Sequence, residues 1–178
     1  MTIFKILNTD KKIINFSSSE LIEGDTAYPV LSTASGCPIT GLAFSDGITE
    51  RMYSSFEIPN NWVIGSDIIA YVHYFNNTTQ SGEKVCSWII DYQIFNDLEN
   101  VSDKTTTRAG VDSILPESVN SSTYIKAELT ISGSDTYNPI SKNKFFSFSV
   151  CRGCDYGDDT MDGDAILALL SFEIEVEV

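Results

Sequence analysis

The sequence predicts an all-β protein, an antiparallel β-sandwich of the jelly-roll type with about eight strands. Ile, Val, Thr and the aromatic residues total 65, whereas the helix formers Ala, Leu, Met, Lys, Arg, Gln and Glu total 45. Short apolar segments recur between polar turns along the chain. Long polar segments between strands favour a two-sheet sandwich over an up-and-down barrel. No repeat and no Pro- or Gly-rich linker divides the 178 residues.

The first half of the chain contains the less regular patterns. Residues 1–25 predict an N-terminal arm that docks on a neighbouring subunit, or else a plain edge strand. Residues 26–178 are then expected to form a single sandwich domain. Within it, residues 27–44 have room for two short strands, and residues 52–58 alternate weakly up to Pro59.

The middle of the chain predicts two long strands that lie side by side. Residues 67–75 read DIIAYVHYF and residues 85–95 read VCSWIIDYQIF, with a polar turn over residues 76–84. Residues 96–122 are polar and are expected to form a loop.

The last third of the chain contains the clearest strand pattern. Residues 124–131 and 144–152 predict two strands, with a turn over residues 133–138 between them. Residues 165–178 predict the final strand, in which apolar and acidic residues alternate: Phe172, Ile174, Val176 and Val178 with Glu173, Glu175 and Glu177. Such alternation puts one face on a core and the other in water.

The charge balance restricts the partners of the protein. Eleven basic residues against 25 acidic ones give a formal net charge of −14, so nucleic acids and anionic membrane surfaces are not expected partners. No apolar run approaches the roughly 18 residues of a spanning helix, and residues 1–10 lack the features of a signal peptide. Residues 155–178 contain eight acidic residues and no basic one. This acidic edge is expected to face solvent, a cation or a basic partner.

Catalytic motifs are absent from the sequence. The single histidine, His73, shares a predicted strand face with Ile69, Tyr71 and Phe75, which favours a packed or rim aromatic over a general base. No Walker, Rossmann, G-x-S-x-G or H-E-x-x-H pattern is present. A glycoside hydrolase or lyase is kept as an alternative only because carboxylates are plentiful. We therefore expect a protein that is not an enzyme.

The four cysteines are expected to remain thiols in a reducing compartment. Cys151 and Cys154 form a CxxC motif, which zinc and redox sites also use. This motif ends a predicted strand rather than opening a helix, and Cys37 and Cys86 form no second pair. Two structural thiols are the favoured interpretation.

The acidic segment DYGDDTMDGD, residues 155–164, has two interpretations. It matches the start of a calcium-binding loop, and its candidate ligands are Asp158, Asp159, Asp162 and Asp164. The twelfth loop position is Leu169 instead of the bidentate glutamate, so any calcium site is of another type. The alternative is a solvated turn whose aspartates bind backbone amides. No other cofactor is expected.

The two tryptophans differ in their context. Trp88 lies in a predicted strand, with Ile90, Tyr92 and Ile94 at even spacing, and is expected in the core. Trp62 lies in the loop FEIPNNWVIGSD and is the candidate for an exposed, sugar-stacking aromatic.

Three ordered motifs resemble those of small β-sandwich virion proteins of tailed phages. The first runs from Phe56-Glu-Ile-Pro59 through Trp62 and Gly65 to Asp67. The second contains Gly82 and the strand with Trp88. The third runs from Val150-Cys-Arg152 through Asp155, Asp159-Thr160 and Gly163-Asp164-Ala165 into the final strand. Together they span about residues 50–178.

The resemblance implies a non-enzymatic virion component, namely a capsid decoration, auxiliary capsid or head-fibre protein. Such a protein is made in the host cytoplasm, forms a homo-oligomer that is often a trimer, and binds the major capsid protein or other virion proteins. The alternative is a lectin-like, carbohydrate-binding jelly-roll module in which Trp62 stacks on sugar and the acidic segment binds calcium. Fold alone does not choose between these functions.

Overall fold

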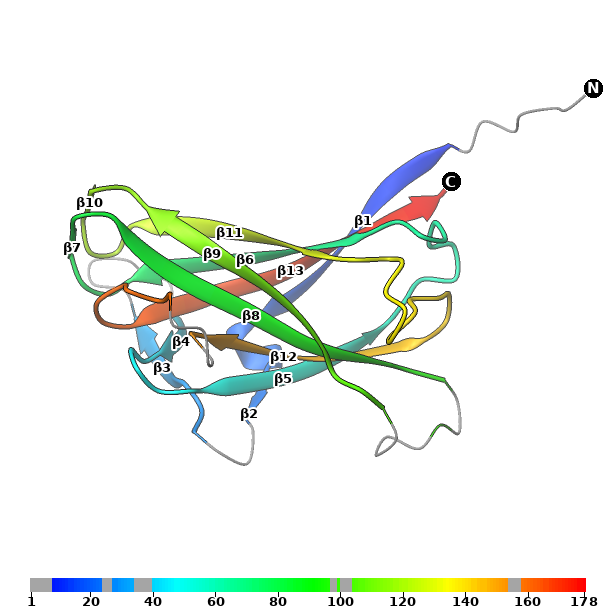
Figure 1. Ribbon diagram of the computed structural model, residues 1–178, viewed down its shortest axis with the longest axis horizontal. Coiled ribbons are helices and arrows are strands. Elements are labelled where there is room, and N and C mark those ends of the chain that lie inside the picture. Colours follow the sequence, from blue (N-terminus) through cyan, green and yellow to red (C-terminus); the bar gives the residue numbers. More distant parts are fainter. Residues whose placement is uncertain (1–7, 24–26, 34–39, 97–98, 100–103, 154–157) are drawn as a thin grey trace, which may run out of the picture.

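The chain forms two antiparallel sheets packed face to face (Figure 1). The structure, a computed structural model, describes residues 8–23, 27–33, 40–96, 99, 104–153 and 158–178. All strand pairings within this described part are antiparallel, as the predicted jelly-roll sandwich requires. The prediction of an all-β sandwich is therefore confirmed.

Sheet A is built around the last strand of the chain. It has the order β11-β6-β13-β4-β3, and β1 pairs with β13 beyond the end of β4. Its strands are β1 (Thr9–Ser17), β3 (Val30–Thr33), β4 (Thr40–Phe44), β6 (Ile68–Asn76), β11 (Tyr124–Ile131) and β13 (Ala165–Glu177). Thus part of the segment expected as an arm or edge strand is an edge strand of this sheet. The outer ends of β1 and β13 extend beyond the body of the sandwich (Figure 1).

Sheet B has the order β2-β5-β12-β8-β9. Its strands are β2 (Ile22–Glu23), β5 (Arg51–Glu57), β8 (Lys84–Phe95), β9 (Thr107–Leu115) and β12 (Phe145–Arg152). A short 3-10 helix, η1 (Ser18–Glu20), links β1 to β2, and the two-residue strands β7 (Gln80–Ser81) and β10 (Ser118–Val119) pair with each other.

The prediction that residues 67–75 and 85–95 form neighbouring strands is wrong. These segments are β6 and β8, and they belong to different sheets. β6 pairs with β11 and β13, whereas β8 pairs with β9 and β12. Both strands bury large apolar side chains between the two sheets. Strands of two facing sheets bury such side chains just as paired strands of one sheet do, so the apolar pattern does not show which strands pair.

The expected loop over residues 96–122 also needs correction, because it contains β9. Along this strand, exposed residues such as Arg108 and Asp112 alternate with the partly buried Ala109 and Val111. An edge strand buries few large side chains, so its apolar signal in the sequence is weak. β9 lies near β11 of the other sheet and closes this side of the sandwich.

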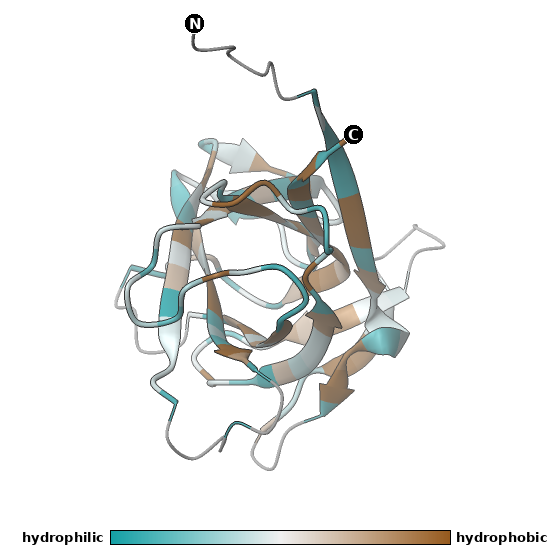
Figure 2. Cartoon of the chain, turned by 90° about the vertical axis from the view of Figure 1, so that its right-hand side faces the viewer, coloured by the Kyte–Doolittle hydropathy of each residue, from teal (hydrophilic) through white to brown (hydrophobic). Residues whose placement is uncertain are grey.

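An aromatic core holds the sheets together. Phe172 of β13 packs against Phe148 of β12 at 4.8 Å between ring centroids and against Phe56 of β5 at 5.2 Å. Trp88 lies against Phe44 and Tyr74, each at 5.3 Å, as expected for a core residue. Figure 2 shows the two layers from one end, with apolar and polar bands alternating along β1. The alternation predicted for β13 is present, since Phe172 and Ile174 are fully buried.

Candidate functional site

The outer face of sheet B carries a row of polar side chains across four strands. The register places Tyr53 of β5 beside Ser149 of β12, then Asp91 of β8, then Arg108 of β9. These residues share one face because side chains alternate along each strand and their positions are paired. Their neighbours along the strands, such as Phe148 and Ile90, point into the core.

Two arginines hold one carboxylate on this face. Arg108 donates from Nε to Asp91 Oδ1 at 2.7 Å and from Nη2 to Asp91 Oδ2 at 3.0 Å. Arg51 donates from Nη1 to Asp91 Oδ2 at 2.6 Å and to the Ser149 hydroxyl at 3.2 Å. We call Arg51, Asp91 and Arg108 the Arg–Asp–Arg cluster. Its formal charge is +1, on a chain whose balance is −14.

The cluster keeps Asp91 ionised. Burial by itself would raise the pKa of Asp91, but the hydrogen bonds from Arg108 and Arg51 outweigh it, and the net pKa lies below the ordinary value. An ionised carboxylate that already accepts three charged hydrogen bonds is a poor general acid or base. Its role in the site is therefore to orient the two guanidinium groups.

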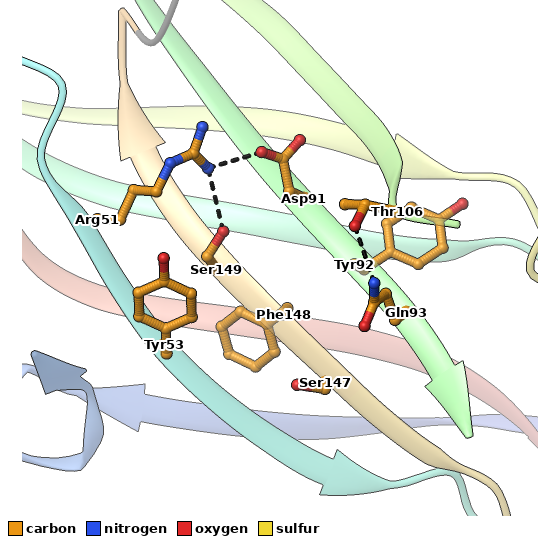
Figure 3. Close-up of a pocket in the computed structure, with 9 residues that line it drawn as sticks. All are labelled: Arg51, Tyr53, Asp91, Tyr92, Gln93, Thr106, Ser147, Phe148 and Ser149. Atoms are coloured by element: carbon orange, nitrogen blue, oxygen red, sulfur yellow. Dashed lines mark hydrogen bonds and ion pairs between the residues drawn. The ribbon is translucent and has the colours of Figure 1, made fainter. Parts of the chain in front are cut away.

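A cavity of about 310 Å³ opens beside the cluster (Figure 3). Arg51 and Tyr53 line it from β5, Asp91 from β8, and Ser147 and Ser149 from β12 between them. Gln93 and Thr106 complete the polar lining, and the Gln93 amide donates to the Thr106 hydroxyl at 2.9 Å. The volume is near the lower end for ligand pockets, which suits a small polar group or one ring of a longer ligand.

Exposed aromatic side chains lie at the cavity and farther along the same face. Tyr53 is 40% exposed at the cavity, and Phe145, on β12, is 48% exposed. Phe145 pairs with Glu57, four residues along β5 from Tyr53, a separation of roughly 13 Å along the strand. Polar side chains of Ser55, Ser147 and Gln93 occupy the row between them. We call this surface, from Arg108 to Phe145, the sheet B face.

The structure contradicts the prediction that Trp62 is an exposed aromatic. Its side chain is fully buried, and the residue forms a bridge with Val176 at the end of β13. The loop that contains Trp62 packs down onto the end of sheet A, because the Val63 and Glu177 amides bond to carbonyls across this junction. Trp62 is thus a core residue and takes no part in the site.

The acidic residues predicted to bind calcium have separate partners. Asp159 pairs with the buried Arg152 at 2.9 Å, and Asp162 pairs with Lys84 at 3.1 Å. Asp164 accepts from the Asn77 amide at 2.9 Å, and Asp158 is exposed. In the described ranges, no three His, Cys, Asp or Glu side chains gather as a metal site would require. Asp155, which belongs to the third motif of the resemblance, lies outside the described residues.

Arg152 explains why Asp159 faces inward. The residue is 3% exposed, and its guanidinium donates to both Asp159 oxygens and to the backbone carbonyls of Phe44, Met161 and Gly163. These five hydrogen bonds match the five N–H donors of an arginine. The Arg152–Asp159 pair therefore joins the acidic segment to the end of β4, which is a structural role.

The cysteine prediction is wrong for Cys151, which is disulfide-bonded. Cys86 is a free, buried thiol, and burial raises its pKa to about 12, so it is inert at neutral pH. Cys37 and Cys154 lie outside the described residues.

His73 is a rim aromatic on the outer face of sheet A, as its sequence context predicts. It stacks on Tyr124 at 5.9 Å between centroids, and its Nδ1 lies 2.6 Å from the Tyr124 hydroxyl. Burial, and secondarily the charge of Lys126, lowers the pKa of His73 and so favours the neutral imidazole. His73 lies on the sheet opposite the one that carries the Arg–Asp–Arg cluster.

The sequence analysis did not identify the residues of the sheet B face. A signal was present, since Arg51, Arg108 and Arg152 are the three arginines of the chain and two of them lie on this face. The sequence pattern does not show which strands pair, and it is strand pairing that brings Arg51 to Asp91, 40 positions away.

No family model matches the chain, and no curated protein matches it. Solved structures of similar fold include a xylan-binding module, CBM15, with a TM-score of 0.44 and 13% identity, over 93% of this chain and 97% of that one. Another is the CBM36-1 domain of a multidomain xylanase from the hindgut metagenome of Trinervitermes trinervoides. Its TM-score is 0.42, with 10% identity, over 92% of this chain and 96% of that domain.

An exo-β-1,3-galactanase from Phanerochaete chrysosporium has a TM-score of 0.45 and 10% identity, over 90% of this chain. The match covers 29% of the galactanase. At these identities the likeness concerns the fold. In the described part of the chain, no helix has the length and apolar character of a membrane span.

Proposed function

We propose that this protein is a carbohydrate-binding module that holds its ligand on the sheet B face. The observation that carries the proposal is the cavity beside Tyr53, where an exposed aromatic ring adjoins hydroxyl, amide and guanidinium groups of Ser147, Gln93 and Arg51. Sugar rings present apolar C–H faces and many hydroxyls, so they need an aromatic surface together with donors and acceptors.

The arrangement favours binding over catalysis. Asp91 is the carboxylate that lines the cavity, and two arginines hold its pKa low. Glycoside hydrolysis uses a pair of carboxyl groups, one of which is protonated. The residues that line this cavity contribute one carboxylate, the ionised Asp91, and no second carboxyl group to act as the protonated acid, so the proposed role is non-enzymatic.

The test is to measure binding of the purified chain to a panel of soluble polysaccharides and oligosaccharides by titration calorimetry. The first variant is Tyr53→Ala, and the matched control is Tyr124→Ala, which removes a similarly exposed tyrosine from the other sheet. We expect a ligand whose affinity falls about tenfold or more in Tyr53→Ala and is unchanged in Tyr124→Ala. Loss only in Tyr124→Ala would place the site on sheet A and contradict the proposal.

Calcium is tested in the same titrations. The three paired carboxylates of Asp159, Asp162 and Asp164 have partners within the chain, so the proposal does not require the ion. We expect equal affinities with calcium and with a chelator. A ligand that binds only when calcium is present would indicate that the acidic segment, residues 155–164, takes part in binding.

A virion structural protein is the second candidate, and one observation favours it. β3 is the edge strand of sheet A, and its Val30 and Leu31 side chains are 63% and 69% exposed. Exposed apolar edge strands pair readily with other chains, which suits a subunit that assembles into a homotrimer or binds a capsid protein. Native mass spectrometry distinguishes the two candidates, since a strictly monomeric chain would contradict the assembly role.

A further inference from the structure

We infer that the sheet B face recognises acidic sugars, and that Arg51 binds the carboxylate of a uronic acid residue. The inference rests on the proposed carbohydrate-binding function and specifies its ligand class. It depends on the charge of the Arg–Asp–Arg cluster and on the way in which Arg51 is held.

The charge of the Arg–Asp–Arg cluster differs from that of the chain, although Glu57 of β5 and Asp112 of β9 are also outward carboxylates on the sheet B face. Two of the three arginines lie in the cluster against one aspartate, whereas the whole chain has more than twice as many acidic as basic residues. A neutral sugar needs no such excess of positive charge. The nearest outward carboxylate along β9 is Asp112, which accepts from the Ser87 hydroxyl at 2.6 Å.

Arg51 has donors left for a ligand. Within the described residues, the hydrogen bonds of its side chain all leave from Nη1, toward Asp91 and Ser149. Nε and Nη2 are therefore available, and Arg51 lines the cavity together with Tyr53 (Figure 3). Asp91 holds this guanidinium in place before binding, which reduces the entropy lost on binding. A planar guanidinium matches a carboxylate in geometry as well as in charge.

The neighbouring groups suit the rest of a uronic acid residue. Tyr53 offers its ring to the sugar, while the Ser147 hydroxyl can donate or accept and the Gln93 amide oxygen can accept, since the Gln93 amide nitrogen already donates to Lys104 and Thr106. A carboxylate on the ring would then lie toward Arg51, since Arg51 and Tyr53 are two positions apart on the same side of β5. The row of outward side chains continues from the cavity through Ser55 to the exposed Phe145, so a longer chain can continue in that direction.

The experiment uses paired ligands. Tetrasaccharides of galacturonate, mannuronate and glucuronoxylan are each compared with their carboxyl-reduced, neutral counterparts by titration calorimetry on the full chain. We expect at least one uronate to bind about tenfold or more tightly than its neutral counterpart. We also expect this preference to shrink as salt is raised, because screening weakens a partly exposed charge contact.

Variants then assign the contact. Arg51→Met should abolish the preference for the uronate, so that the uronate and its neutral counterpart bind with similar affinities, and Arg51→Lys should retain part of the preference. The matched control is Lys126→Met, which removes one positive charge from the outer face of sheet A. Melting temperatures of all variants show that they are folded.

The two proposals fail in different ways. Equal binding of uronate and neutral partner would overturn the acidic-sugar inference while leaving the carbohydrate-binding proposal intact. An equal loss of both ligands in Arg51→Met would show that Arg51 contacts hydroxyls, which also overturns the inference. Binding of no saccharide in either form would overturn both proposals.

Discussion

The chain builds two arginine–aspartate groups in contrasting ways. Arg152 and Asp159 lie at the end of the sandwich, where the guanidinium is buried and all five of its donors are used by the protein. The Arg–Asp–Arg cluster lies on the open sheet B face, where Arg51 uses one of its three nitrogens. In the first group a fully bonded arginine holds parts of the fold together, whereas in the second Arg51 keeps unused donors for the proposed ligand.

The strongest test of this comparison removes the buried cation. Arg152→Met removes the charged donor of the Asp159 carboxylate, which keeps the Ser87 and Met161 amides, and it removes the same donor from three backbone carbonyls around a buried side chain. We expect the free energy of unfolding to fall by about 3–5 kcal/mol, as for a buried ion pair deprived of one partner. Urea denaturation measures this value. A fall of less than about 1 kcal/mol would mean that the pair behaves like a surface contact.

The matching change on the sheet B face should have a small effect on stability. Arg51→Met leaves Asp91 paired with Arg108, and solvent reaches the site. The expected fall in unfolding free energy is about 1 kcal/mol, between the ranges for exposed and for buried pairs, because the Arg51 and Asp91 side chains are 19% and 11% exposed and Arg108 still pairs with Asp91. If the same denaturation experiment gave a loss as large as that of Arg152→Met, the cluster would be structural and its proposed availability to a ligand would be wrong.

The pH dependence of the unfolding free energy tests the contribution of the Asp91 carboxylate to the Arg–Asp–Arg cluster. The pKa of Asp91 is lowered in the folded chain, so its contribution is present above the unfolded value of about 3.9 and is lost as pH falls through the lower folded value. We expect the stability of Asp91→Asn to fall less steeply in acid than that of the unmodified protein. Denaturation curves at a series of acidic pH values compare the two proteins, and identical declines would contradict the cluster geometry.

The smallest expected effect concerns His73, on the opposite face. Its pKa is also lowered on folding, so the unfolded chain takes up a proton first as pH falls below about 6.5. Stability should therefore decrease as pH falls from neutrality toward the folded pKa, and His73→Gln should remove this component. Glycan binding should be unchanged in His73→Gln, because the residue lies on the other sheet. A pH-dependent binding defect in this variant would move the site to sheet A.

Several elements could be predicted from the sequence because their signal is local. β5, β6, β8, β11, β12 and β13 lie within a residue or two of the predicted bounds, since each buries a recognisable set of apolar side chains. β9 was missed because an edge strand needs fewer such residues. Trp62 was misplaced because the burial of a loop depends on the surface beneath it, here the end of β13.

The sequence by itself determined that this chain forms an all-β sandwich, because alternation of apolar and polar residues has a physical meaning within a single strand. Tertiary structure alone decided which strands pair, and hence the site. Arg51, Asp91 and Arg108 lie 40 and 17 positions apart and come from β5, β8 and β9. Only the register of β12 between β5 and β8, and of β9 beside β8, brings their side chains together on one face.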